Sequence, residues 1–107
     1  MGENGFPLSL PSSQEACAVI GQEFRVRGGS EDHGVLLLEE VKAERSRAAS
    51  TAWRMPYSMF LRGPSGESLP QGIYTLFHPA FGPLCLYLVP RSRELRTGAV
   101  RYEAVFD

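Results

Sequence analysis

The sequence lacks the features of a membrane protein and of a strongly charged one. No apolar run approaches the roughly 18 residues that a membrane-spanning helix needs. The segment Met1–Asn4 has neither the basic start nor the apolar stretch of a signal peptide. The net charge of the 107 residues is −1, so the chain has no overall attraction to nucleic acid or to an anionic membrane. We therefore expect no nucleic-acid or membrane partner, and a location in the cytoplasm or in an assembled extracellular particle.

Cysteine is scarce. Cys17 and Cys85 are the two cysteines, and neither lies in a CxxC motif or near a histidine at metal-ligand spacing. This pattern is typical of two reduced, buried side chains that pack as small apolar groups. The alternative is a disulfide that joins the N-terminal segment to the apolar hairpin of Gly72–Pro90.

Sequence motifs of common enzyme classes are also missing. Neither GxxxxGK[ST] nor GxGxxG occurs, and Gly63-Pro64-Ser65-Gly66 is not a nucleophile elbow because Glu67 stands where a second glycine is required. Glu31, Asp32 and His33 are adjacent in a glycine-rich segment, and adjacent residues seldom converge on one ion, so we interpret this segment as a solvated turn. The sequence predicts no catalytic, cofactor-binding or metal-binding residues, and hence a protein that is not an enzyme.

The most informative segment that is present is Gly72–Pro90. Two apolar runs, 73–78 and 84–89, flank a segment with two prolines and a glycine, which predicts an antiparallel hairpin. The two-residue period places Tyr74, Leu76 and His78 on one face, and both faces of both strands are largely apolar. A strand with one wet face shows cleaner alternation, so we expect this hairpin to be central and covered on both sides.

The remaining pattern predicts a mainly β domain. Ser12 and Glu15 have capping-box spacing, which predicts a short helix from Ser13 to about Ile20. Further strands are predicted at 23–27, 35–42, 57–62 and 99–106, with polar turns between them. About six short strands favour an antiparallel rolled sheet or a small half-open barrel with one short N-terminal helix. We expect residues 1–107 to form a single domain in which 1–11 are a loosely ordered lead-in.

Candidate functional residues are few. His78 ends a buried strand before Pro79, where its ring is expected to hydrogen-bond to an unpaired backbone carbonyl at the turn. Trp53 lies between Arg47 and Arg54 in the segment 43–56, whose secondary structure the pattern does not define. Because Trp and Arg are enriched at interface hot spots, these three residues are the predicted interaction residues.

Several motifs together resemble a known family. They run in order from Gly21 to Phe106: GQEFRV at 21–26, LLLEEV at 36–41, FLRGP at 60–64, QGIYTLFHP at 71–79, GPL at 82–84, LVP at 88–90 and YEAVF at 102–106. Their order and spacing resemble a family of small bacterial domains of unknown function that occur beside proteins with phage tail-collar-like domains. The resemblance implies a fold but no catalytic residue. It links the chain to phage-tail-like assemblies only through the genes that neighbour members of the family.

Two functions follow from these observations. The first is a non-enzymatic protein-interaction or assembly module, with a protein partner or self-association as a homo-oligomer, in a phage-tail-like or fibre-forming system. The alternative is a small ligand-binding or enzymatic β-barrel with a pocket near His78, in which Tyr74 or Tyr87 takes part.

Overall fold

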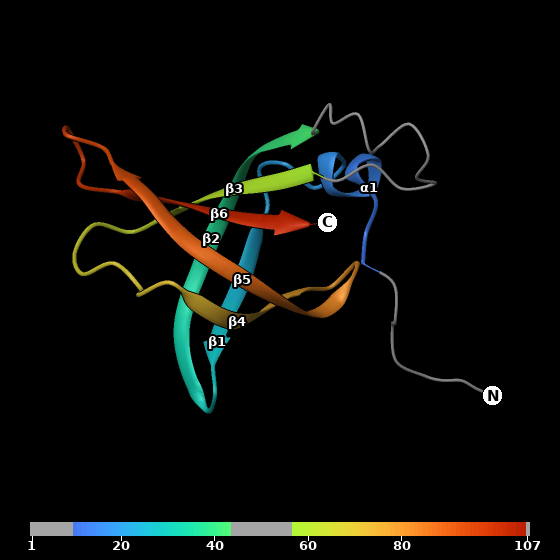
Figure 1. Ribbon diagram of the computed structural model, residues 1–107, viewed down its shortest axis with the longest axis horizontal. Coiled ribbons are helices and arrows are strands. Elements are labelled where there is room, and N and C mark those ends of the chain that lie inside the picture. Colours follow the sequence, from blue (N-terminus) through green and yellow to red (C-terminus); the bar gives the residue numbers. More distant parts are fainter. Residues whose placement is uncertain (1–9, 44–56, 107) are drawn as a thin grey trace.

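The computed structural model describes residues 10–43 and 57–106, which form a closed antiparallel β-barrel with one short helix (Figure 1). The elements are α1 (Ser13–Cys17), β1 (Glu23–Gly28), β2 (Glu31–Ala43), β3 (Tyr57–Gly63), β4 (Gly72–His78), β5 (Gly82–Arg93) and β6 (Val100–Phe106). The strand order around the wall is β1-β2-β3-β6-β5-β4, and β4 pairs with β1 to close it. The predicted fold class is confirmed, and the sheet closes completely.

The wall consists of two meanders of three strands, β1-β2-β3 and β4-β5-β6, joined by the β3–β6 and β1–β4 pairs. The middle strands, β2 and β5, are the longest, and each pairs first with the strand before it and then with the strand after it. Register shifts at Leu38/Glu40 in β2 and Pro90/Ser92 in β5 mark bulges. A bulge bends its strand and increases its twist, which allows a six-stranded sheet to close.

The core follows from the two-residue period. Phe24 and Val26 of β1 point inward while Arg25 and Arg27 point outward, as the sequence predicts. On β6 every second residue from Val100 to Phe106 is buried, also as predicted. The barrel interior is therefore filled by large apolar side chains that exclude water, the most deeply buried being Tyr57, Phe24, Leu38, Met59, Leu61, Leu76, Leu88 and Val26.

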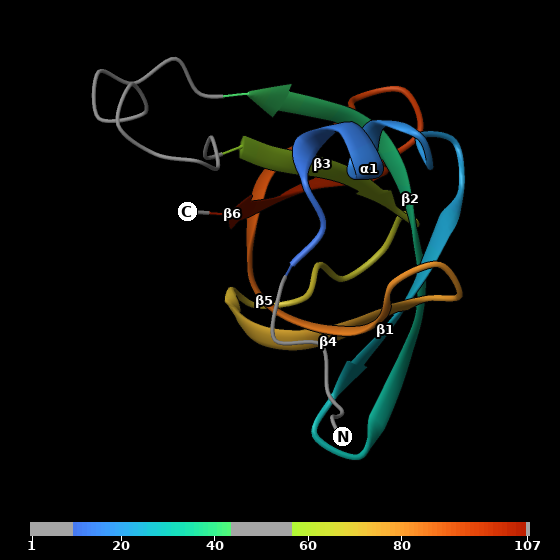
Figure 2. The ribbon, with the colours of Figure 1, turned by 90° about the vertical axis from the view of Figure 1, so that its right-hand side faces the viewer.

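Both ends of the barrel are covered. At one end lies α1 (Figures 1 and 2), which contributes Ala16 to the core and is held by the predicted capping box between Ser12 and Glu15. The helix ends at Cys17, earlier than predicted. At the other end runs the β3–β4 connection, whose backbone is fixed by two core tyrosines: Tyr102 Oη accepts from Leu69 N at 2.9 Å, and Tyr74 Oη donates to Pro70 O at 2.6 Å. No helix among the described residues has the length and apolar character that a membrane crossing requires.

Three sequence predictions are corrected. The segment 31–34 is not a solvated turn but the start of β2, because Gly28 pairs with Glu31 and only Gly29 and Ser30 form the turn. Gly29 has a φ of 62°, as the first central residue of a type II′ turn requires. The β4–β5 hairpin forms as predicted, but only its inner face is covered. Cys17 and Cys85 are both free and exposed, so they neither pair nor pack in the core.

Candidate functional site

The outer wall of the barrel carries a group of apolar side chains on three adjacent strands, β4, β5 and β6. Ile73 lies directly opposite Tyr87, and Phe77 lies opposite Pro83. The β5–β6 register, which begins at Leu88 and Ala104, brings Val105 to the side of Tyr87. We call this surface the apolar outer face and define it by five outward-pointing residues: Ile73, Phe77, Cys85, Tyr87 and Val105.

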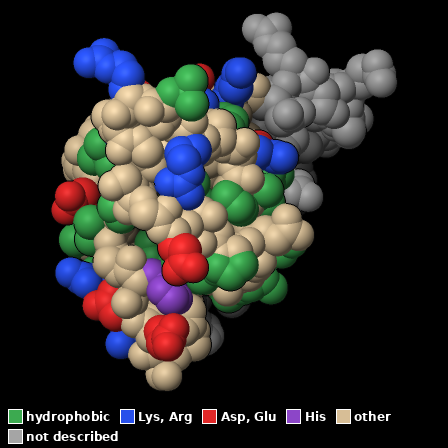
Figure 3. Space-filling view, turned by 90° about the vertical axis from the view of Figure 1, so that its left-hand side faces the viewer, with side chains coloured by type: hydrophobic (Ala, Val, Ile, Leu, Met, Phe, Trp, Pro, Cys, Tyr) green, Lys and Arg blue, Asp and Glu red, His purple; other side chains and the backbone are tan. Residues whose placement is uncertain are grey.

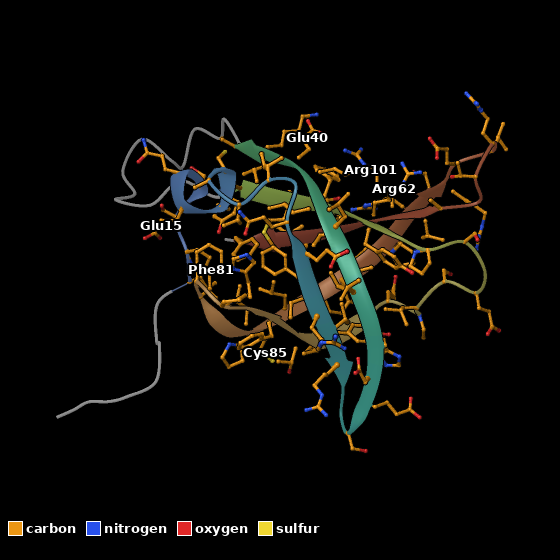
Figure 4. All side chains as sticks on the ribbon, turned by 180° about the vertical axis from the view of Figure 1, so that it is seen from behind. Glu15, Glu40, Arg62, Phe81, Cys85 and Arg101 are labelled. Carbon is orange, nitrogen blue, oxygen red and sulfur yellow. The ribbon has the colours of Figure 1, made fainter. Side chains whose placement is uncertain are left out.

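Exposure distinguishes the apolar outer face from the rest of the wall. Within the described part of the chain, six large apolar side chains are exposed, and four of them belong to this face, with Ile73 the most exposed of the four at 67%. Cys85, labelled in Figure 4, lies on the outer side of β5 in the middle of this surface. Single exposed apolar residues are common, whereas a group on adjacent strands is a candidate contact surface.

Arginines border the apolar outer face on the β1 side. Arg25 pairs in register with Phe77, and Arg27 pairs with Thr75. Arg25 Nη1 lies 2.9 Å from Asp32 Oδ2, whereas Arg27 has no ion-pair partner among the described residues. A hydrogen bond from the Gly34 amide, with help from Arg25, lowers the pKa of Asp32. The β1 side of the face therefore carries two guanidinium groups, of which Arg25 is held by Asp32 and Arg27 makes no close ion pair among the described residues.

A second candidate lies further round the wall, where charged side chains surround a groove of about 380 Å³. Three arginines and two glutamates line it: Arg62, Arg93, Arg101, Glu39 and Glu94. Figure 4 labels Arg62, Arg101 and the neighbouring Glu40 side by side along this part of the barrel. On the side drawn in Figure 3, basic and acidic side chains are interspersed, so the arginines form a local feature and not part of a broad basic surface.

Hydrogen bonds hold the carboxylates around this part of the wall in their ionised form. Thr97 and then Arg62 lower the pKa of Glu94. On the outer wall between the two candidates, the pKa of Glu103 is lowered first by the Ser58 hydroxyl, which donates to its carboxylate at 2.7 Å, and also by Arg91. These ionised groups fix the arginines that they contact.

His78 has a structural position. Its side chain is buried, Nδ1 accepts a hydrogen bond from Ala80 N at 3.0 Å, and Nε2 lies 2.7 Å from Gln22 Oε1. Because Nδ1 is the acceptor, Nε2 carries the proton and donates to Gln22. The ring does bond to the backbone of the turn, but the predicted carbonyl partner is wrong, because the ring accepts from the Ala80 N–H group. A small hollow of about 180 Å³ near this turn is lined by other residues, among them Leu10 and Phe81.

The sequence predicted neither surface as a site. The predicted interaction residues Trp53, Arg54 and Arg47 lie outside the described residues. The Tyr74 hydroxyl donates a hydrogen bond to the Pro70 carbonyl, and burial raises the pKa of Tyr74. Tyr87 points outward onto the apolar outer face. Among the described residues, no three His, Cys, Asp or Glu side chains gather closely enough to hold a metal ion. The signal for the apolar outer face was present in the two apolar sides of the 73–89 hairpin, which we interpreted as burial.

Comparison with known proteins identifies a family. No curated protein matches this chain, and no solved structure does. The model of a family described as "Domain of unknown function (DUF6916)" matches residues 11–106, which contain the complete barrel and α1. The chain therefore belongs to this family of domains of unknown function.

Proposed function

We propose that this domain is a non-enzymatic protein-docking module and that the apolar outer face is its docking surface. The observation that carries the proposal is the exposure of Ile73, Phe77, Tyr87 and Val105 on three adjacent strands. Leaving such a group in water is unfavourable by about 25 cal/mol for each Å² of apolar surface, and contact with a partner recovers this free energy. Tyr and Phe also provide large rigid contact areas, which are frequent at interface centres.

The partner recognises side chains and not a strand edge. A closed barrel offers few unpaired backbone groups, so addition of a partner strand has little to bind. The outermost paired segment of β2, which starts at Glu31 and Asp32, is charged, and charged residues oppose edge pairing. The face that remains for contact is the pleated outer surface of β4, β5 and β6.

Charge complementarity specifies the partner. Arg27 borders the apolar outer face across from Asp32 but makes no close ion pair among the described residues, and Arg25 borders it beside Phe77. On the flanking strands Asp32 is engaged by Arg25 and Glu103 by Ser58 and Arg91, whereas Glu23 of β1 is exposed and has no ion-pair partner among the described residues. We propose that the partner is a different protein, with an apolar contact segment flanked by an acidic residue that meets Arg27. A second copy of the chain is the competing outcome of the test below.

The resemblance of the sequence to domains that occur beside phage tail-collar-like proteins supports one choice of partner. We propose that the partner is a subunit of a phage-tail-like or fibre-forming assembly. In such a particle a small rigid barrel serves as a fixed contact point between larger subunits.

The chain offers a matched pair of variants for the test. Ile73→Asp places a charge in the apolar outer face, whereas Ile20→Asp changes an isoleucine with 43% exposure outside it. In co-purification from cells that carry the neighbouring genes, we expect Ile73→Asp to lose the partner and Ile20→Asp to retain it. Recovery of the same partner in equal amounts by both variants would contradict the proposal.

The two exposed cysteines provide a second readout without mutation. Cys85 lies within the apolar outer face and Cys17 lies in α1 outside it. In the complex, alkylation of Cys85 is expected to slow while alkylation of Cys17 is unchanged. If Cys85 instead becomes protected as the concentration of the pure protein rises, and light scattering shows a dimer, the partner is a second copy and the proposed different protein is wrong.

A further inference from the structure

We propose that the groove lined by Arg62, Arg93 and Arg101 is a binding site for an oxyanion, a carboxylate or phosphate group of a ligand. This site is distinct from the apolar outer face and does not depend on the proposed docking function. It is the larger of the two hollows described above, and its volume of about 380 Å³ lies within the range of small-molecule sites.

The central observation is an arginine pair. Arg62 of β3 and Arg101 of β6 are direct neighbours across the two strands. Like charges in directly opposed positions are destabilising unless an anion lies between them. Phe60 holds Arg101 in place, because the guanidinium carbon lies 4.4 Å from the centre of its ring. The barrel therefore holds two guanidinium groups side by side on neighbouring antiparallel strands, where one anion can contact both.

In the structure the carboxylate between the two arginines is that of Glu39, and its contacts with both guanidinium groups are long. Its carboxylate lies 3.5 Å from Arg62 Nη1 and 3.7 Å from Arg101 Nε, although a well-formed pair between a guanidinium and a carboxylate has a separation of about 2.7–2.9 Å. Glu39 occupies the bulge of β2, where the strand departs from regular pairing. Bulges are frequent beside binding sites because they re-aim a side chain. We infer that Glu39 is an internal stand-in for the oxyanion of a ligand.

The groove also contains an uncompensated positive charge. Arg93 Nη1 donates to the Gly98 carbonyl at 2.8 Å and has no carboxylate partner among the described residues. The other carboxylates are engaged more tightly than Glu39: Glu94 lies 2.8 Å from Arg62, and Glu40, outside the groove lining, lies 2.6 Å from Arg101. Displacement of Glu39 alone would then leave a pocket with three guanidinium groups around it.

The surrounding backbone is suited to hold this geometry. The β5–β6 turn is closed by Glu94 N to Ala99 O at 2.7 Å and by Gly98 N to Glu94 O at 2.8 Å. Thr97 also donates to the Glu94 carboxylate, so the turn and the arginines belong to one hydrogen-bonded unit. A site on such fixed elements needs little ordering when a ligand binds.

The test is an NMR titration of the full chain with inorganic phosphate and, separately, with succinate. Sodium chloride at matched ionic strength controls for screening. We expect saturable shifts of the amides of Glu39, Val100 and Arg101 with at least one oxyanion and not with chloride. A response to phosphate alone identifies a phosphate ligand, a response to succinate alone identifies a carboxylate ligand, and a response to both supports a general oxyanion site.

Two variants with opposite expected effects separate binding from a purely structural ion-pair network. Glu39→Gln removes the internal competitor and is expected to tighten oxyanion binding about threefold to tenfold, whereas Arg93→Gln is expected to weaken it about tenfold. Arg96→Gln, in the same turn but outside the lining, is the matched control and should leave binding unchanged. Equal shifts with chloride, or weaker binding by Glu39→Gln, would overturn the proposal.

Discussion

Ser58→Ala is expected to destabilise the barrel through a single carboxylate in its wall. Ser58 Oγ donates to Glu103 Oε2 at 2.7 Å, and Arg91 Nε donates to Oε1 at 2.7 Å, so each carboxylate oxygen has its own donor. Ser58 is 5% exposed and the Glu103 side chain 16% exposed, which leaves little access for a replacement water. A hydrogen bond to a charged group contributes about 1.5–3 kcal/mol. Because Arg91 remains, we expect a loss of about 1–2 kcal/mol in the free energy of unfolding at neutral pH.

The pH dependence of this loss has a definite sign. Ser58 and Arg91 lower the pKa of Glu103 below 4.5 in the folded state. The ionised carboxylate therefore stabilises the fold above its unfolded-state pKa, and this stability is lost as the pH falls through the lower, folded-state pKa. Ser58→Ala raises the folded-state pKa of Glu103, so the variant loses the stabilisation by the ionised carboxylate at a higher pH than the wild type. The difference in the free energy of unfolding between the wild type and the variant should be largest at neutral pH and should decrease as the pH falls below 4.5.

Urea titrations between about pH 7 and pH 3 measure this difference directly. In thermal scans at neutral pH, each kcal/mol corresponds to about 4–8 °C in Tm for a domain of this size. Glu103→Gln keeps the shape of the acceptor and removes its charge, so Ser58→Ala should lose less than half as much stability in that background. A loss below about 0.3 kcal/mol, or one that is constant from neutral to acidic pH, would refute the reasoning.

Three further predictions concern packing and thiols. A Cβ on Gly63 would lie 2.9 Å from Leu36 Cδ2 and 3.0 Å from Tyr102 Cε1, so Gly63→Ala should destabilise by about 1–3 kcal/mol in urea titrations, whereas Gly72→Ala, with its nearest atom at 3.9 Å, should cost less. Leu88→Ala removes a side chain with no exposure and should cost about 2–5 kcal/mol, against less than about 0.5 kcal/mol for the fully exposed Leu95→Ala. Both thiols should react with Ellman's reagent in the folded protein without a reductant, and a failure of both to react would contradict their free, exposed state.

The sequence predicted what depends on neighbours along the chain. The capping box at Ser12, the inward residues of β1 and β6, and the pairing of β4 with β5 all follow from local spacing, and the structure confirms them. The class of fold also follows, because about six short strands with regular turns leave few alternatives. What the strand pattern does not contain is the pairing of β1 with β4, which closes the barrel between residues about 50 positions apart.

The candidate sites depend on the same long-range pairing, and this explains why the sequence missed them. Apolar residues on both faces of a strand predict burial on both faces, yet the structure covers only the inner one; exposure is decided by what packs outside, which the strand pattern does not encode. Arg62 and Arg101 are 39 positions apart, and only the β3–β6 register makes them neighbours. Likewise, the polar residues Glu31 to Gly34 resemble a turn until their pairing with β1 is known.

The two proposed surfaces share one strand, and this makes their independence testable. On β6, Arg101 belongs to the arginine groove and Val105 to the apolar outer face, with Glu103 between them. Val105 is four positions beyond Arg101, which corresponds to about 13 Å along the strand. At that distance, substitutions with no common partner act additively. Ile73→Asp should therefore leave phosphate or succinate binding within about twofold of the wild type, and Arg93→Gln should leave partner docking unchanged. A mutual effect larger than this would mean that one partner covers both surfaces, with a carboxylate in the groove and apolar side chains on the face.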